Sequence, residues 1–98
     1  MNKDIKKIAE HFRADTQLDK LREEALELVD AIDECYSPIG YCPNDHLLEE
    51  MADTRLMIKQ VNYLIGTEKL VDEIEKQKIA RTLERIKTGY YEEKANGS

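Results

Sequence analysis

Two acidic motifs, Glu23-Glu24-Ala25-Leu26-Glu27 and Glu50-Met51-Ala52-Asp53, decide how this 98-residue chain is interpreted. The first reads EExxE, the second reads ExxD, and each lies inside a strongly helical stretch. Residues three apart lie on adjacent turns of one helix face, so each motif pairs two carboxylates. Like charges held this close repel each other unless a cation lies between them. The two motifs therefore predict a site for a hard cation, and Mg²⁺ is its natural occupant.

The apolar residues around these motifs repeat with helical spacing, and no segment shows convincing strand alternation. The sequence therefore predicts an all-α fold. Four helices are expected, and they cover about Lys3 to Phe12, from after Asp15 to before Ser37-Pro38-Ile39-Gly40, from Asn44 or Asp45 to Gly66, and Glu68 to Lys87, which ends before Gly89. Thr16, with Asp19 three residues later, is expected to cap the second helix, and Thr67 the fourth.

The acids lie beside the apolar stripes of their helices. The stripe of the second helix consists of Leu18, Leu21, Ala25, Leu28, Val29 and Ile32. Glu24 lies about 80° from its centre, and Glu50 about 60° from the centre of the apolar stripe of the third helix. We therefore expect these acids at the shoulder of the core, half-buried and close together. Carboxylates in such a place need a cation or protons.

Length and charge bound the possible functions. The chain is expected to form a single domain over residues 1–98, with a polar tail at 92–98. A core of this size is modest, so self-association is a plausible way to bury more apolar surface. The formal net charge of -6 argues against non-specific binding to nucleic acid polymers or to anionic membranes.

The two cysteines and the N-terminus bear on the compartment. No secretory or transmembrane segment is recognisable, so we expect a cytoplasmic protein with reduced thiols at Cys35 and Cys42. A zinc site would need both cysteines together with His46 and His11, and this spacing matches no zinc module. His46 is interpreted as a loop or capping residue.

The order and spacing of the acidic motifs resemble those of a known family. EExxE followed by ExxD on the next helix, with 22 residues between Glu27 and Glu50, is similar to the signature of the MazG-like all-α nucleoside triphosphate pyrophosphohydrolases. The flanks resemble the family as well, and so does the K-xx-R-xxx-R stretch from Lys78 to Arg85. The resemblance covers about residues 15 to 91.

The resemblance implies a fold and an activity. The fold is a four-helix bundle assembled as a homodimer or a dimer of dimers. The activity is the hydrolysis of a (deoxy)nucleoside triphosphate to the monophosphate and pyrophosphate, with Mg²⁺, or Mn²⁺ in its place. Clearing of the nucleotide pool is the role that the family suggests.

The resemblance also implies roles for individual residues. The metal ligands carried over by motif are Glu24, Glu27, Glu50 and Asp53. Glu24 or Glu27 is the candidate catalytic base, while Glu23 and Glu49 are expected to support the ligands. The candidates for substrate binding are Lys78, Arg81, Arg85 and Gln17. The three cations lie on one face of the fourth helix, which could equally be a solvated face, and Gln17 could bind a base or simply start a helix.

Some features depart from the family, and other functions stay open. Thr54-Arg55 stands where family members often carry an apolar residue. The Ser/Thr-rich loop of the related phosphoribosyl-ATP pyrophosphatases is not found, which disfavours that subfamily. A non-enzymatic helical dimerisation or interaction module would also explain the amphipathic helices, and a catalytically degraded relative would only bind nucleotide.

Overall fold

The computed structural model describes residues 2–91, and this part of the chain is mostly helical. Its elements are α1 (Lys3–Glu10), α2 (Ala14–Glu34), β1 (Tyr36–Ser37), β2 (Gly40–Tyr41), α3 (Asp45–Ile65) and α4 (Glu68–Lys87). The all-α class predicted from the sequence is confirmed, apart from a small β-hairpin between α2 and α3. The predicted tail at 92–98 lies outside the described residues. Among residues 2–91, no helix has the length and apolar character needed to cross a membrane.

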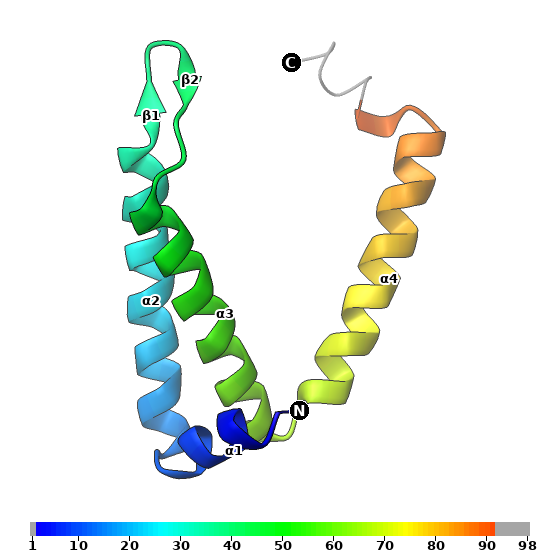
Figure 1. Cartoon of the computed structure of the whole chain (residues 1–98). Coiled ribbons are helices and arrows are strands. Elements are labelled where there is room, and N and C mark those ends of the chain that lie inside the picture. Colours follow the sequence, from blue (N-terminus) through cyan, green and yellow to red (C-terminus); the bar gives the residue numbers. More distant parts are fainter. Residues whose placement is uncertain (1, 92–98) are drawn as a thin grey trace. The chain divides into compact units, whose positions relative to one another are not determined.

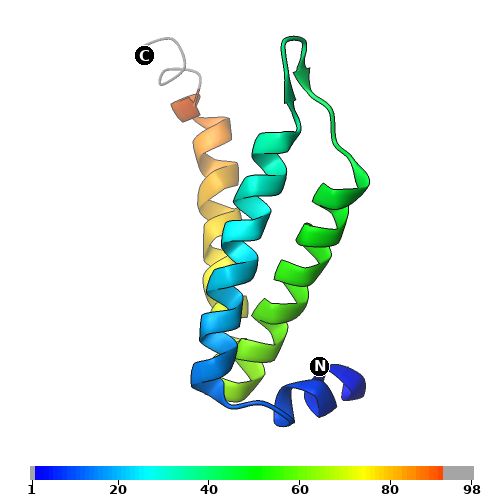
Figure 2. The same cartoon turned by 90° about the vertical axis from the view of Figure 1, so that its left-hand side faces the viewer.

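The chain divides into two units, residues 1–66 and the segment that begins at Thr67. In the first unit, α2 and α3 run antiparallel side by side, and both views show the β-hairpin at one end of this pair (Figures 1 and 2). At the other end, α1 packs on α3, where the Tyr63 hydroxyl donates a hydrogen bond to the Glu10 carboxylate. The second unit contains α4.

Local sequence signals account for both ends of α3. The Asn44 side chain accepts a hydrogen bond of 2.9 Å from the Leu47 backbone N–H, which confirms Asn44 as the cap of α3. Gly66 ends α3 in the left-handed region, with φ of 70°, as its position predicts. The expected cap at Thr16 is wrong: α2 begins at Ala14, and Thr16 lies inside the helix.

The segment between α2 and α3 is a tight β-hairpin. Tyr36 pairs with Tyr41 and Ser37 pairs with Gly40, and the Cys42 N–H donates to the Cys35 carbonyl at 2.8 Å. Two-residue strands are too short to show alternation in the sequence, so the hairpin was not expected. It connects the end of α2 directly to the start of α3, and thereby fixes which turns of the two helices face each other.

The packed face of α2 differs from the predicted apolar stripe. The buried residues of α2 are Gln17, Glu24 and Ala31, which repeat every seven residues, and those of α3 are Glu50, Met57, Gln60 and Val61. In contrast, Leu18 is 46% exposed, and Val29 is 52% exposed. Glu24 and Glu50 are therefore more buried than a shoulder position implies, because they lie on the side along which the two helices meet.

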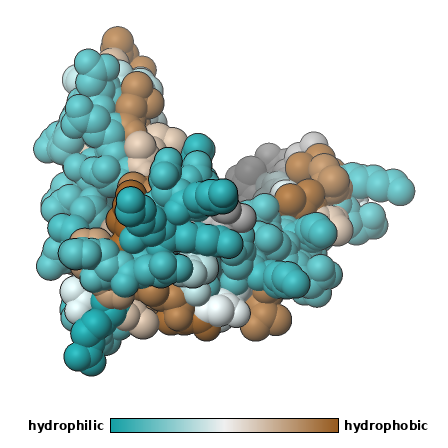
Figure 3. Space-filling model, turned by 60° about the horizontal axis from the view of Figure 1, so that its bottom comes forward, coloured by the Kyte–Doolittle hydropathy of each residue, from teal (hydrophilic) through white to brown (hydrophobic). Residues whose placement is uncertain are grey.

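One side of the α2–α3 pair carries an exposed apolar surface. Each of its residues follows a buried or half-buried position by one, and we call them the α2–α3 apolar face: Leu18, Ala25, Ile32, Met51, Ile58 and Ile65. A step of one residue turns a helix by about 100°, and in antiparallel helices this step leads to the same side of the pair. The space-filling view shows brown apolar groups at several places on the surface of the described residues (Figure 3). All six residues of the α2–α3 apolar face are exposed.

The second unit shows a similar excess of exposed apolar groups. None of the residues of α4 is buried. Its large exposed apolar side chains are Leu70, Val71, Ile74, Ile79, Leu83 and Ile86. An amphipathic helix without a buried residue gains little stability from its own sequence, since packing of the apolar face supplies most of it.

Candidate metal centre

Three of the four predicted ligands converge between α2 and α3. One carboxylate oxygen from each of Glu24, Glu27 and Glu50 lies within 4.8 Å of the other two. Glu24 and Glu27 come from adjacent turns of α2, as the EExxE spacing predicts, and Glu50 reaches them from α3. Among the residues that the structure describes, this is the one group of three or more acidic, histidine or cysteine side chains close enough to hold a metal ion.

Two of these carboxylates are buried without adequate partners. Glu24 and Glu50 are each only 8% exposed. The Oε2 atoms of both side chains are inaccessible to solvent and have no hydrogen-bond partner in the described part of the chain. Burying an ionised oxygen in this way is costly unless a cation or a proton neutralises it. The cluster therefore has the burial and the unmet charge of a cation site.

The pKa of Glu24 reflects the same uncompensated negative charge. Burial raises the pKa of the Glu24 carboxyl above its usual 4.5, and the charge and hydrogen bond of Glu27 raise this pKa further. Asp53 acts in the same direction, while the Lys20 ammonium lowers the pKa. The net rise means that the protein alone does not compensate the negative charge at this position.

A cation of the protein borders one side of the cluster. Lys20 Nζ lies 3.6 Å from Glu24 Oε1 and 3.4 Å from Glu23 Oε2. The Lys20 side chain is half exposed, so these contacts are weak, and the buried Oε2 of Glu24 stays unpaired.

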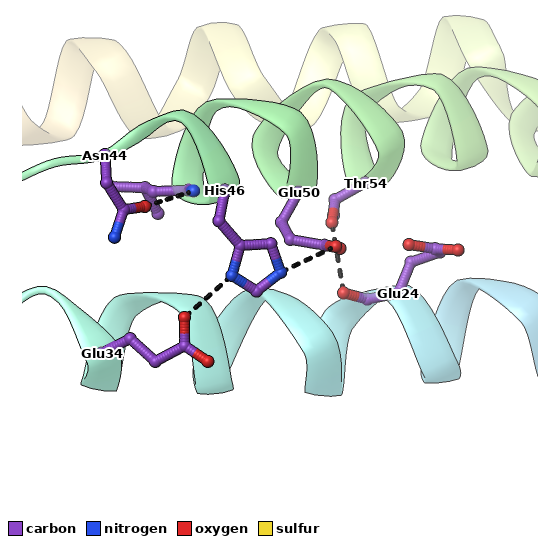
Figure 4. A network of polar contacts seen from close by, with 7 residues as sticks. Glu24, Glu34, Asn44, His46, Glu50 and Thr54 are labelled. Atoms are coloured by element: carbon purple, nitrogen blue, oxygen red, sulfur yellow. Dashed lines mark hydrogen bonds and ion pairs between the residues drawn. The ribbon is translucent and has the colours of Figure 1, made fainter.

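On the other side, His46 connects the cluster to the end of α2. Its Nδ1 lies 2.8 Å from Glu34 Oε2, and its Nε2 lies 3.5 Å from Glu50 Oε1 (Figure 4). The hydrogen bond to Glu34, together with the nearby carboxylate charges, raises the pKa of the His46 imidazole. His46 is the second residue of α3, and Asn44 caps the helix, so the interpretation of His46 as a capping residue is wrong.

Thr54 makes a second polar contact between the helices. Its hydroxyl donates to the Glu24 backbone carbonyl at 3.3 Å (Figure 4). Thr54 thus has a structural use in this chain. The contact holds α3 against the turn of α2 that carries Glu24.

The remaining predicted acids lie at the exposed edge. Asp53 is exposed and is not a member of the 4.8 Å group, although its charge raises the pKa of Glu24. Glu23 is exposed and pairs with Lys20, and Glu49 is exposed one residue before Glu50. Their roles as a fourth ligand and as supporting residues stay predictions.

Gln17 is buried two turns before Glu24 on the same face of α2. It is 3% exposed, and its Oε1 has no hydrogen-bond partner among the described residues. Gln17 is therefore a buried residue of the first turns of α2 with an unmet acceptor. Its contact with a base stays a prediction.

The predicted phosphate-binding cations belong to the second unit. Lys78, Arg81 and Arg85 all lie on α4. The Arg85 guanidinium stacks over the Tyr90 ring at 4.7 Å, and its hydrogen bond to Tyr91 lowers the pKa of that phenol. Arg85 thus has aromatic partners of its own, and phosphate binding by all three cations stays a prediction.

Sequence reasoning missed Lys20, His46 and Thr54 as neighbours of the acids. Each lies four residues from an acid of the cluster on the same helix: Lys20 from Glu24, and the other two from Glu50. The i, i+4 spacing was the available signal. The cysteines and His11 do not join the metal-binding group, and both thiols are free.

Comparison of the chain with protein-family models, with curated proteins and with solved structures gives no match. The likeness to the MazG-like enzymes therefore depends on the two acidic motifs and their flanks.

Proposed function

We propose that this chain is a Mg²⁺-dependent nucleoside triphosphate pyrophosphohydrolase of the MazG-like type. It would hydrolyse a (deoxy)nucleoside triphosphate to the monophosphate and pyrophosphate, and so clear the nucleotide pool of a cytoplasm. The observation that carries the proposal is the cluster of Glu24, Glu27 and Glu50, in which two buried carboxylate oxygens lack partners. A chain that needed these acids only for solubility would leave them in water.

The donor set fits Mg²⁺. The cluster offers only carboxylate oxygens, which suit a hard divalent ion, and contains neither a thiolate nor an imidazole. Mn²⁺ accepts the same oxygen ligands and is expected to substitute. When bound, the ion supplies neutralisation of the phosphate charge and activation of a water molecule.

The residues of the cluster have different roles in binding the ion and in catalysis. Glu24 and Glu50, which are buried, hold the ion, and Asp53 is the proposed fourth ligand at the exposed edge. Glu27 is exposed, so a carboxylate faces the side from which the substrate arrives. As the water oxygen bonds to phosphorus and the anhydride P–O bond breaks, Glu27 or Glu24 takes the proton of the water. Burial raises the pKa of the Glu24 carboxyl in the absence of an ion.

Self-association is part of the same proposal. The α2–α3 apolar face is exposed, with Ile58 at 43% and Ile65 at 46%. A second copy that presents the same face would bury both surfaces in a four-helix arrangement, as a homodimer or within a dimer of dimers.

The apolar face also favours the second candidate function, a helical dimerisation or interaction module without catalysis. Such a module would use the same exposed residues but would have no use for the acidic cluster. The two candidates therefore differ in one measurable property, the response to a divalent ion.

The test is release of pyrophosphate from a panel of ribo- and deoxynucleoside triphosphates, including modified bases, with Mg²⁺, with Mn²⁺ and with EDTA. We expect turnover with either ion and none with EDTA. Glu24→Gln and Glu27→Gln should each lower the rate by roughly 10²–10³-fold, because several kcal/mol of charge stabilisation is lost.

The matched control is Asp30→Asn, an exposed acid of α2 outside the cluster, which should keep full activity. No turnover of any nucleotide by the wild-type protein, with either ion, would exclude the hydrolase and leave the interaction module or a relative that only binds nucleotide.

A further inference from the structure

Three side chains form a continuous polar connection from the end of α2 to the acidic cluster. Glu34 Oε2 and His46 Nδ1 are 2.8 Å apart, and His46 Nε2 lies 3.5 Å from Glu50 Oε1 (Figure 4). Because an ionised carboxylate only accepts hydrogen bonds, Glu34 must accept the Nδ1–H of the ring. This bond fixes the orientation of the imidazole and directs its second nitrogen to Glu50.

Glu50 is held from both sides along one face of α3. His46, Glu50 and Thr54 follow one another at intervals of four residues, so they lie on consecutive turns. His46 contacts the Glu34 side chain, and Thr54 contacts the backbone carbonyl of Glu24, both on α2. The turn of α3 that carries Glu50 is thus attached to α2 above and below.

A glutamate has three rotatable side-chain bonds, and fixing them costs conformational entropy. At Glu50 one oxygen, Oε1, faces His46, while the other, Oε2, is buried without a partner. Without the imidazole, the carboxylate would be free to turn toward solvent and away from Glu24 and Glu27. The contact with His46 therefore favours the rotamer that closes the cluster.

We propose that His46, held in place by Glu34, is a positioning residue that keeps the Glu50 carboxylate within reach of Glu24 and Glu27 for binding of a divalent ion. This inference rests on the metal site of the proposed function. It adds two residues outside both acidic motifs.

Direct binding of the ion by His46 fits the geometry less well. The ring is not a member of the group whose ligand atoms lie within 4.8 Å of one another. Its Nδ1 is engaged by Glu34, and its Nε2 approaches the outer oxygen of Glu50. Residues that orient ligands from behind in this manner typically change metal affinity by about 10–100-fold when they are removed.

The test is Mn²⁺ binding to the purified protein, followed by the EPR signal of the free ion, so no substrate or turnover is needed. His46→Ala should raise the Kd for Mn²⁺ by about 10-fold or more. His46→Gln should recover part of this loss, because the amide can place an N–H donor near the position of Nε2. Glu34→Gln should also weaken binding, and should have no further effect in the His46→Ala background, since both act through one contact.

Two controls separate this inference from the proposed function. His11→Ala removes the other histidine, which lies outside the cluster, and should leave the Kd unchanged. Glu24→Gln should abolish binding, which tests the metal site itself. Thermal unfolding of each variant without metal identifies any loss that is due to misfolding.

Three results would overturn the role of His46. If His46→Ala binds Mn²⁺ within twofold of wild type while Glu24→Gln does not bind, the metal site stands and the positioning role falls. If pulsed EPR of the bound Mn²⁺ shows a coupled nitrogen that disappears in His46→Ala, the histidine is a ligand and acts directly. If the wild-type protein binds no Mn²⁺, the metal site of the proposed function falls together with the positioning role.

Discussion

The two sides of α2 contrast sharply. The side that packs on α3 carries Gln17, Glu24 and Ala31, while the side displaced by one residue carries Leu18, Ala25 and Ile32 and is exposed. Burial of hydrophobic groups would by itself favour the opposite arrangement. The structure thus places charge inside and apolar surface outside along the same helix.

The contrast has one physical explanation that covers both sides. Buried carboxylates are stable only with a cation or protons, and an exposed apolar face becomes stable against another protein surface. In the proposed function, a different component stabilises each side of α2: an ion between α2 and α3, and a second copy on the α2–α3 apolar face. Separate experiments can supply or deny each component.

The largest effect is expected on self-association, when a residue on the exposed apolar side is substituted. Ile58→Glu introduces a charge into the α2–α3 apolar face of both copies. An uncompensated buried charge costs about 3–5 kcal/mol, so association should weaken by roughly 100-fold or more. Sedimentation or light scattering across a dilution series measures this shift from dimer to monomer.

The matched control places the same substitution at another isoleucine. Ile39 lies at the tip of the β-hairpin and is 92% exposed, so Ile39→Glu should leave association unchanged. A wild-type protein that stays monomeric at every concentration would exclude self-association through this face.

A smaller effect is expected on the free energy of unfolding when Mg²⁺ is added. Mg²⁺ at about 100 times its Kd should raise the free energy of unfolding by about 2.7 kcal/mol, because the ion binds the folded state only. Thermal unfolding with Mg²⁺ and with EDTA gives the difference as a shift in Tm. Glu24→Gln should remove the shift and Asp30→Asn should keep it, whereas a shift of equal size in Glu24→Gln would place the ion elsewhere.

The helices themselves were predictable because their ends depend on local chemistry. Asn44 at the start of α3 and Gly66 at its end provide a side-chain acceptor and a left-handed backbone, and both act within one turn. Thr16 failed as a cap because α2 begins two residues earlier, at Ala14, with Arg13 at the N-cap position and no side-chain cap hydrogen bond. A helix that begins without a side-chain cap leaves no local signal in the sequence at its first residue.

The packed side of α2 was less predictable because it depends on another helix. Periodicity gives the direction of the apolar stripe but not which side a neighbour covers, and here the β-hairpin between Ser37 and Gly40 sets the register of α3 against α2. Acids three residues apart lie on adjacent turns of one helix face, so the closeness of Glu24 and Glu27 was predictable from the sequence. The contact from Glu34 to His46 depends on the register between the helices and could not be predicted.

The smallest expected effect is the change in stability caused by the charge of Glu24 when no ion is bound. The pKa of Glu24 is raised in the folded protein by burial and then by the charge of Glu27, so in the unfolded chain the group loses its proton more easily. Between the unfolded pKa near 4.5 and the raised folded pKa, the folded state holds more protons, and stability falls as the pH rises. Above this pH interval, the ionised Glu24 carboxylate destabilises the metal-free folded state by its full amount. Below the interval, Glu24 is protonated in both states and this destabilisation is absent.

Glu24→Gln removes that charge, and in EDTA at pH 7 it should therefore stabilise the protein, by about 1 kcal/mol. At pH 4 the substitution should have little effect, because the Glu24 carboxyl is protonated in the folded state. Urea unfolding of Glu24→Gln and wild type at the two pH values measures both differences, with Asp30→Asn as the control for an exposed charge. A loss of stability at pH 7 would mean that the carboxylate is already satisfied without a cation, and the same residue that is proposed to bind the ion would then have no need of one.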